Sequence, residues 1–337
     1  MRARIEAARE QLAGFLGVRP RQVVFTSSGT EAINAAVFGA ARAAPGRPIA
    51  SAGVEHSAVR DASARAAPTV EIGVDRTGRI DLGDVLALVE SPPAQRPALV
   101  HCQWANHEVA TLQPVKEVVA ACRAASVPVH VDACAAAGQL PIDLGALGAD
   151  LVSVSAHKLG GPGGVGALVV AQGSRFEPFI VGGQQERARR AGFENALGIV
   201  GFGAAAAALG SGRVEREAER ARHLVAQLAA AALRTEGVVV VGDRDPERRL
   251  PHLVCLGVAG VEAEPVVIGL DRAGVAVHSG SACSSEALEP SAVLAAMGAD
   301  PEHSLRLSVG WSTTDVDIAA FASAFGTVVE GLRALAG

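Results

Sequence analysis

The chain has 337 residues, more than a single compact core usually serves, so we expect two domains or one large α/β domain. Hydrophobic residues make up 49% of the sequence and charged residues 19%, a composition that buries a substantial core and excludes a disordered chain. With 30 basic and 35 acidic residues, the formal net charge is −5. This charge argues against nucleic acid or an anionic membrane as a direct partner.

No stretch of about 20 apolar residues is free of charges, so we expect no membrane-spanning helix. Residues 1–18 have the pattern of an amphipathic helix and lack the apolar run of a secretory signal. The cysteines form no C-x-x-C pair, which argues against structural zinc and predicts free thiols in a reducing compartment. They are Cys102, Cys122, Cys134, Cys255 and Cys283. The sequence therefore predicts a cytoplasmic protein.

Short apolar runs alternate with longer helical patterns through the first two hundred residues. Strands are predicted at residues 23–25, 49–52, 98–104, 128–132, 151–155 and 166–170. Several of these runs are almost continuous in Val, Leu and Ile, as expected of strands that are covered on both faces. Helical stretches such as residues 31–44 and 114–125 are long enough to be crossovers. The alternation predicts a doubly wound α/β sheet.

The pattern changes after about residue 210. A long alanine-rich helix with charged residues on one side is predicted at residues 213–234. Strands with larger spacings follow at residues 253–257, 275–278 and 305–309, and a final helix at residues 314–335. We therefore expect a large α/β domain over residues 1–210 and a smaller α+β domain over residues 211–337.

A lysine follows the strand predicted at residues 151–155, within the sequence LVSVSAHKLGGPGGVGAL. At the end of a buried strand and among small residues, the amine of Lys158 can form an imine with an aldehyde cofactor. The glycines of residues 160–164 let the backbone pass close to a bound ligand. Taken alone, Lys158 is equally consistent with a solvent-facing residue at the exit of a strand.

Two further segments place polar groups where open α/β sheets bind their ligands. Asp132 ends the strand PVHVDA, where it either pairs with a protonated pyridine nitrogen or caps the next helix. Residues 25–31, FTSSGTE, lead into a helix whose first N–H groups favour an anion, with Gly29 and Thr30 as the best phosphate ligands. The hydroxyls in this segment are equally consistent with capping alone. Together with Lys158, these segments indicate pyridoxal phosphate.

A collinear set of motifs strengthens this interpretation. They are FTSSGTE at residues 25–31, EHSAV around His56, HVDA at Asp132, SAHK at Lys158, GGQQERARRAG at residues 182–192, HSGSACSSEALEPS around Cys283 and LRLSVGWSTTDVDI at residues 305–318. In this order, from about residue 5 to the C-terminus, the chain resembles the cysteine desulfurases. These are class V aminotransferase-like, fold-type I pyridoxal-phosphate enzymes, with a large mixed or parallel sheet domain and a smaller α+β C-terminal domain.

The resemblance implies roles for most of the candidate residues. Lys158 holds the cofactor through its imine and later moves the Cα proton of the substrate. Asp132 faces the pyridine nitrogen, and His56 stacks on the ring. The residues that hold the phosphate are Gly29, Thr30, Ser155 and His157.

Two more residues are implied for the substrate. Arg306 matches the arginine that takes the substrate carboxylate, for which its bidentate fork is suited. Cys283 matches the nucleophile that attacks the substrate sulfur. Its surroundings, residues 279–285, are too polar and flexible for a core, whereas Cys102 and Cys255 lie on apolar strands and Cys122 in a helix.

Four features depart from the family pattern. The relatives' Asn-Asn-Glu segment reads Asn106-His107-Glu108 here, so His107 replaces an asparagine that contacts the cofactor, and we expect it to restore part of that bonding. Ala135 stands where relatives have a glutamine near the cofactor's phenolic oxygen. Phe193 stands where they have a threonine that reaches the phosphate from the partner subunit. The chain also begins at the helix that follows the relatives' N-terminal segment of several dozen residues.

The resemblance implies conversion of L-cysteine to L-alanine, with the sulfur held as a persulfide on Cys283. Another class V reaction is an alternative, either lysis of selenocysteine or cysteine sulfinate or transamination. Cys283 separates these, because a transaminase needs no cysteine. A truncated relative that is weakly active or non-catalytic is the third hypothesis, for which Ala135, Phe193 and the short N-terminus are the evidence.

The expected partners also follow from the resemblance. L-cysteine is the substrate, a sulfur-acceptor protein receives the product sulfur, and the protein forms a homodimer with composite active sites. The sequence identifies no particular acceptor. We expect no metal, no direct nucleic-acid partner and no membrane partner.

Overall fold

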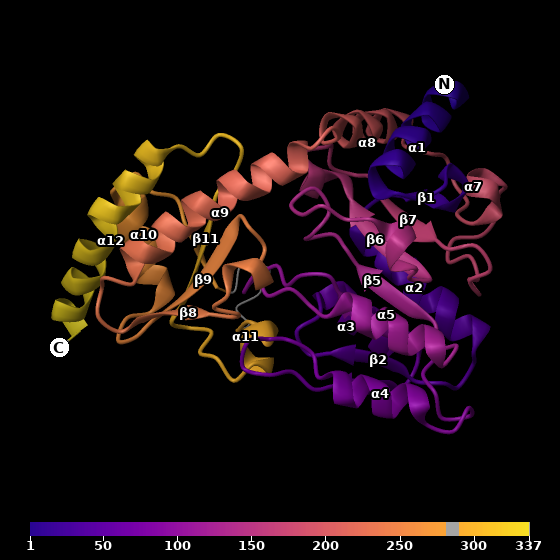
Figure 1. Cartoon of the computed structure of the whole chain (residues 1–337), viewed down its shortest axis with the longest axis horizontal. Helices are drawn as coiled ribbons and strands as arrows, with labels where there is room; N and C mark the ends of the chain where they lie inside the picture. The colour runs from indigo at the N-terminus through magenta and orange to yellow at the C-terminus, as the bar shows by residue number, and fades with distance from the viewer. Residues whose placement is uncertain (281–289, 337) are drawn as a thin grey trace. The chain divides into compact units, whose positions relative to one another are not determined.

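The structure, a computed structural model, describes residues 1–280 and 290–336 and divides the chain into two compact units (Figure 1). The large unit comprises residues Met1–Gly73, Ile80–Trp104 and Gln113–Val214. The small unit comprises residues Val74–Arg79, Ala105–Leu112 and Glu215–Gly337. Two short segments from the first third of the chain therefore belong to the unit that the C-terminal part builds.

A mixed sheet of seven strands, in the order β1-β7-β6-β5-β4-β2-β3, forms the centre of the large unit. The strands are β1 (Val23–Thr26), β2 (Ile49–Ala52), β3 (Thr69–Ile72), β4 (Leu99–Gln103), β5 (Val129–Asp132), β6 (Leu151–Ser155) and β7 (Gly166–Val170). Strands β2 to β6 run parallel to one another, whereas β7 is antiparallel to both β1 and β6. The predicted α/β class with a mixed sheet is confirmed.

Strand β3 is the strand of this sheet that the apolar pattern did not predict. It lies at the edge, where Thr69 and Glu71 are exposed and Val70 is half-buried. Strands that are covered on both faces read as continuous apolar runs, and β4, β6 and β7 have that pattern. A half-exposed edge strand lacks this signal.

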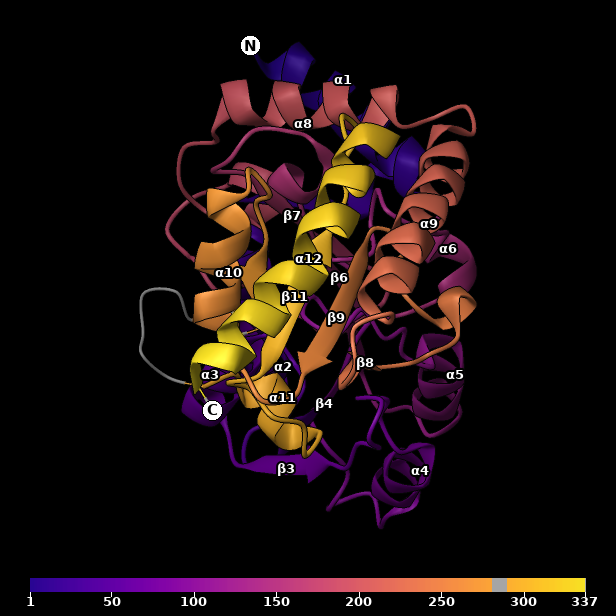
Figure 2. The ribbon, with the colours of Figure 1, turned by 90° about the vertical axis from the view of Figure 1, so that its left-hand side faces the viewer.

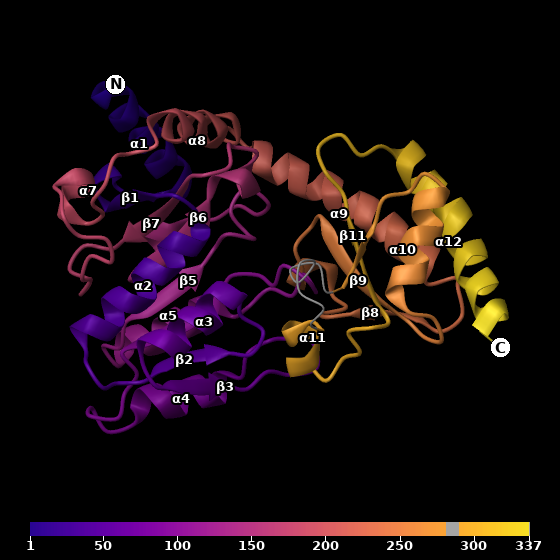
Figure 3. The ribbon, with the colours of Figure 1, turned by 180° about the vertical axis from the view of Figure 1, so that it is seen from behind.

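Helices flank the sheet and several begin at polar caps. They are α1 (Arg2–Leu16), α2 (Gly29–Ala43), α3 (Ser57–Ala66), α4 (Leu82–Glu90), α5 (Val115–Ala124), α6 (Leu144–Leu147), α7 (Gln185–Ala188) and α8 (Ala196–Ala208), with 3-10 turns η1 (Pro20–Gln22) and η2 (Ala156–Leu159). Side chains of Asp81 and Asn195 accept hydrogen bonds from the first turns of α4 and α8. Helices α2 and α3 pack against each other beside the parallel strands (Figure 3).

The small unit is an antiparallel sheet of four strands in the order β10-β11-β9-β8. Its elements are α9 (Arg213–Ala232), β8 (Val238–Val241), η3 (Pro246–Arg248), β9 (Leu253–Val258), α10 (Ala263–Arg272), β10 (His278–Ser279), α11 (Ala292–Ala296), β11 (Ser304–Ser308) and α12 (Asp315–Ala336). The strand predicted at residues 275–278 is wrong in its bounds, because pairing with β11 begins only at His278. Helices α9, α10 and α12 lie over one face of the sheet (Figure 2).

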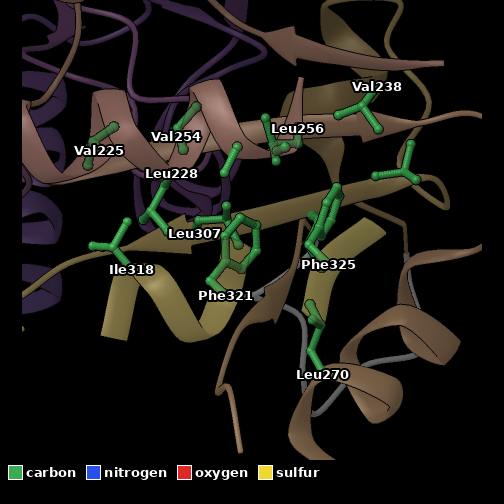
Figure 4. Packing of buried hydrophobic residues seen from close by; sticks show 14 of the residues in the cluster. Val225, Leu228, Val238, Val254, Leu256, Leu270, Leu307, Ile318, Phe321 and Phe325 are labelled. Carbon is green, nitrogen blue, oxygen red and sulfur yellow. The ribbon is translucent and has the colours of Figure 1, made fainter. Parts of the chain in front are cut away.

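Helix α12 supplies the aromatic part of the small unit's core. Ile318, Phe321, Phe325 and Val329 are buried and share one helical face. The rings of Phe321 and Phe325 stack with centroids 5.0 Å apart, against side chains of α9, α10 and the sheet (Figure 4). By length and composition α12 could cross a membrane, but one of its faces packs into the core of the small unit.

A buried ion pair joins three segments of the large unit. The guanidinium of Arg9, on α1, makes two hydrogen bonds of 2.7 Å to the carboxylate of Glu186 on α7. Arg9 also donates to the carbonyl of Val23 at 2.8 Å, and Glu186 accepts from the N–H of Phe25 at 2.8 Å. The pair therefore satisfies backbone groups along β1, which is an edge strand of the sheet.

We predict that Arg9→Met destabilises the large unit by about 3 to 5 kcal/mol, because the substitution leaves the Glu186 carboxylate buried without its partner. Urea unfolding measures the loss. The matched control is Glu10→Gln, an exposed position on the same helix, which should change stability by less than about 0.5 kcal/mol. Equal losses in the two variants would contradict the structural role of the pair.

Candidate active site

The first turn of α2 packs tightly against the ends of strands in the large unit. A Cβ atom on Gly29 would lie 2.7 Å from Sγ of Cys134 and 3.2 Å from Cβ of Ser155. A Cβ atom on Gly166 would lie 2.5 Å from the carbonyl carbon of Ser28. Only glycine permits these approaches. They bring the start of α2, where N–H groups lack partners within the helix, to the carboxyl end of β6.

Glu31 fixes the loop that precedes α2. Its carboxylate accepts the N–H of Ser27 at 2.8 Å, while its own N–H donates to Oγ of Ser28 at 3.1 Å, as in a capping box. The guanidinium of Arg190 donates to both carboxylate oxygens, at 2.8 and 3.2 Å. Burial acts to raise the pKa of Glu31, but the hydrogen bonds from Arg190 and Ser27 outweigh burial and lower it. Glu31 is therefore a carboxylate.

Lys158 lies in η2, directly after β6, and its side chain is exposed. Buried Ser155 ends the strand, and its Oγ lies 3.0 Å from Nδ1 of exposed His157. Burial, and then the charge of Lys158, lower the pKa of His157, which favours a neutral imidazole. Hydroxyl, imidazole and amine thus follow one another at the carboxyl end of a buried strand.

Asp132 ends β5 beside β6 and is buried. Its Oδ1 accepts two hydrogen bonds, from the N–H of Cys134 at 3.0 Å and from Oγ of Ser153 at 2.8 Å. Both donors orient the carboxyl group. This arrangement is what a carboxylate needs if it is to present its other oxygen to a cationic ring.

Cys134 lies at the centre of these groups, within contact of the first turn of α2. Burial raises the pKa of its thiol well above the ordinary value, and Asp132 raises it further against the opposing charge of Lys158. The thiol is therefore protonated and unreactive. Cys134 thus lies between Asp132 and the first turn of α2, which also approaches Ser155 at the end of β6.

His56 caps the N-terminus of α3. Its Nδ1 accepts the N–H of Ala58 at 3.0 Å, so the proton of a neutral ring is on Nε2. The preceding loop is tied to β4, because Gln103 donates its backbone N–H to Glu55 and its side-chain amide to the carbonyl of Val54, both at 2.8 Å. These bonds hold the half-buried imidazole in one orientation.

Two histidines lie behind Asp132 in the sheet. His101 and His130 face each other across β4 and β5, with their Nδ1 atoms 2.8 Å apart and both rings buried. Burial lowers the pKa of His101 to about 3, although Asp132 acts to raise it, and burial also lowers the pKa of His130. The lowered pKa values favour the neutral form of both imidazoles.

In the small unit, Asn106 shapes the segment that carries His107. Its Oδ1 accepts the N–H groups of Glu108 at 2.8 Å and Val109 at 2.9 Å. The carbonyl of His107 accepts a hydrogen bond from Arg306 at 3.3 Å. The structure therefore brings two predicted site residues, His107 and Arg306, together within this unit.

Glu108 is the buried acid of this group. Its carboxylate accepts a hydrogen bond from Oγ of Ser291 at 2.5 Å and lies 3.5 Å from Nε2 of His107. Burial acts to raise the pKa of Glu108, but His107, Ser291 and the charge of Arg306 lower it by more. No carboxylate of the described residues lies within 4 Å of the Arg306 guanidinium.

Two of the remaining predicted positions, Ala135 and Phe193, add no polar group. Ala135, three residues after Asp132, has no side-chain donor, and the ring of Phe193 is 91% exposed. Thr30 lies exposed in the first turn of α2. Cys283 lies outside the residues that the structure describes.

Sequence reasoning missed several residues of the two groups. Ser153 had a signal, because it alternates with Ser155 along β6 and so lies on the same face. Arg190 and Ser291 lie in two of the quoted motifs, but nothing local indicated their partners, because each meets Glu31 or Glu108 across more than 150 residues of sequence.

Comparison with known proteins identifies the family of this chain. The family model for class-V aminotransferases matches residues 1–321. A cysteine desulfurase of Bradyrhizobium diazoefficiens is 39% identical over 98% of this chain and 84% of its own length. A cysteine desulfurase of Archaeoglobus fulgidus is 37% identical over 98% of this chain and 87% of its own length.

Solved structures are similar over the same range. A NifS-like protein from Rickettsia africae superposes with a TM-score of 0.86 at 29% identity, covering 98% of this chain and 88% of its own. The sheet, the order of the motifs and these similarities lead to one conclusion. The chain belongs to the class-V aminotransferase family and, within it, to the cysteine desulfurases.

Proposed function

We propose that this protein is a pyridoxal-phosphate-dependent cysteine desulfurase, which converts L-cysteine to L-alanine and passes the sulfur to an acceptor. The observation that carries the proposal is that Asp132 ends β5, Lys158 follows the neighbouring strand β6, and the first turn of α2 packs against Cys134 and Ser155. Membership of a family whose curated relatives are named cysteine desulfurases supports the same reaction.

The residues of the large unit fit this cofactor. The glycine-lined start of α2 would hold the phosphate, with Gly29, Thr30, Ser155 and His157 as ligands. Asp132 would face the ring nitrogen, held by Ser153, and His56 would cover the ring. When bound, the cofactor supplies an electron sink for the bonds at the substrate Cα.

The chain's own groups would carry the other steps. Lys158 would hold the cofactor covalently and then move the proton of the substrate Cα. Arg306 would bind the substrate carboxylate with its remaining donors. The thiolate of Cys283 would attack the substrate sulfur, so that an S–S bond forms, the C–S bond breaks and Lys158 returns a proton to complete alanine. The persulfide then remains on Cys283.

Two positions favour a weaker variant of the same enzyme. Neither Ala135 nor Phe193 offers a hydrogen-bond donor, so the cofactor would be held by fewer groups than in relatives that have a glutamine and a threonine there. His107 would restore contact only in part, because its Nε2 already faces Glu108. Lysis of selenocysteine or cysteine sulfinate is the second candidate, and it would use the same Lys158 and Arg306.

The domain roles, partners and location belong to the same proposal. Residues 1–210 would bind the cofactor, and residues 211–337 would carry the cysteine segment. A second copy of the chain would cover the exposed apolar side chains of Val181, Phe193 and Leu197. The four described cysteines are free thiols, which supports the cytoplasm as the site of action. The acceptor would be a protein.

Lys158→Ala should abolish the covalent cofactor linkage, because the amine that forms it is lost. The chain has only two lysines, so Lys116→Ala, on the exposed face of α5, is a matched control that should keep the linkage. Borohydride reduction followed by mass spectrometry measures it. A reducible linkage that persists in Lys158→Ala would refute the assignment.

Asp132→Asn should retain part of the cofactor and lose most of the turnover, by about 100-fold or more, since a neutral amide no longer favours the protonated ring. Steady-state alanine production at saturating cofactor measures the effect. The conservative control is Ser153→Ala, which removes one of two hydrogen bonds to the same oxygen and should cost less. An unchanged rate in Asp132→Asn would contradict its role.

Cys283→Ser should separate two steps of the reaction. A hydroxyl stays protonated near neutral pH, so persulfide formation should stop while L-cysteine still binds and exchanges its Cα proton. Persulfide formation is measured by labelling followed by mass spectrometry, and turnover by an assay for alanine. Cys255→Ser, at a buried position in β9, should affect stability more than chemistry. A wild-type yield of alanine from Cys283→Ser would favour the transaminase or lyase alternative.

A further inference from the structure

The pair formed by Arg190 and Glu31 lies beside the first turn of α2. Glu31 is the third residue of that helix, and its carboxylate accepts the N–H of Ser27 in the loop just before it. The guanidinium of Arg190, in the segment that follows α7, donates hydrogen bonds to both oxygens of the Glu31 carboxylate. Both side chains are largely buried, with 19% and 10% of the Arg190 and Glu31 side chains exposed.

A carboxylate at this place disfavours the binding of an anion at the start of the helix. The N–H groups of a first helical turn attract a phosphate, but a nearby negative charge repels it. The hydrogen bonds that Glu31 makes keep it ionised. An adjacent cation is therefore required if α2 is to bind a doubly charged group well.

Several contacts fix the backbone of the segment that carries Arg190. Glu186, Arg187 and Ala188 form a left-handed turn, with φ values of 48°, 59° and 61°, an unfavourable conformation for residues other than glycine. The bidentate pair of Glu186 with Arg9 holds the turn, and the N–H of Ala191 donates to the carbonyl of Ile180. Arg190 therefore meets Glu31 from a fixed backbone.

We propose that Arg190 is a positioning residue for the cofactor phosphate: it cancels the charge of Glu31 and so lets the carboxylate hold the phosphate loop without repelling the phosphate. This inference rests on the proposed function, because it takes the start of α2 as the phosphate site. Arg190 acts through Glu31 and needs no contact with the cofactor.

The test compares two ligands that differ only in the phosphate. Apoprotein is titrated with pyridoxal phosphate and with pyridoxal, and binding is followed by absorbance. Arg190→Met should lower the affinity for pyridoxal phosphate by about tenfold, or about 1.4 kcal/mol. Binding of pyridoxal should not change, and the loss should shrink at high salt. The double variant Glu31→Gln/Arg190→Met should recover most of the affinity, because it removes the repelling charge too.

Matched controls make the outcomes distinct. Arg187→Met removes the same charge from the same segment, where Arg187 forms an exposed pair with Glu6 at 3.4 Å. This variant should bind both ligands with the affinity of the wild type. Arg190→Lys should recover part of the affinity. An equal loss for both ligands, or no recovery in the double variant, would overturn the proposal. Wild-type protein that does not prefer pyridoxal phosphate over pyridoxal would overturn the phosphate site itself.

Discussion

The close approach of α2 to the end of β6 is the constraint on which the rest of the large unit's site depends. It exists because Gly29 and Gly166 have no side chain where a Cβ would overlap Cys134, Ser155 or the backbone of Ser28. Helix N-termini attract anions only at short range, so the approach places the attraction of α2 beside the residues that follow β5 and β6. Asp132 accepts the N–H of Cys134, whose thiol lies against the first turn of α2.

Two bidentate arginine–carboxylate pairs in the large unit involve the same segment, residues 186–190. The pair of Arg9 and Glu186 is buried and satisfies an edge strand, while the pair of Arg190 and Glu31 steadies the loop before α2. A buried pair contributes little net stability, but loss of one partner is costly because a charge is left behind. The two pairs therefore restrict the conformations of the segment more than they stabilise the fold.

In the small unit, the carboxylate of Glu108 interacts with several side chains at once. The carboxylate of Glu108 accepts a hydrogen bond from Ser291 and faces His107. It therefore interacts with the charge of Arg306 electrostatically, without a direct ion pair. An arginine in a direct ion pair would have to break that pair to bind a carboxylate. His107 adds to this group, because its imidazole is a second neighbour of the Glu108 carboxylate.

The sequence by itself predicted six of the seven strands of the large sheet, the positions of Asp132 at the end of β5 and of Lys158 just after β6, and the polar start of α2. These follow from local rules, since buried strands are apolar runs and a parallel sheet delivers its polar residues at one edge. Only the tertiary structure decided that Arg190 meets Glu31, that Ser291 meets Glu108, and that residues 105–112 belong to the small unit. These contacts join segments far apart in the chain, and their partners are set by packing, which leaves no periodic pattern in the sequence.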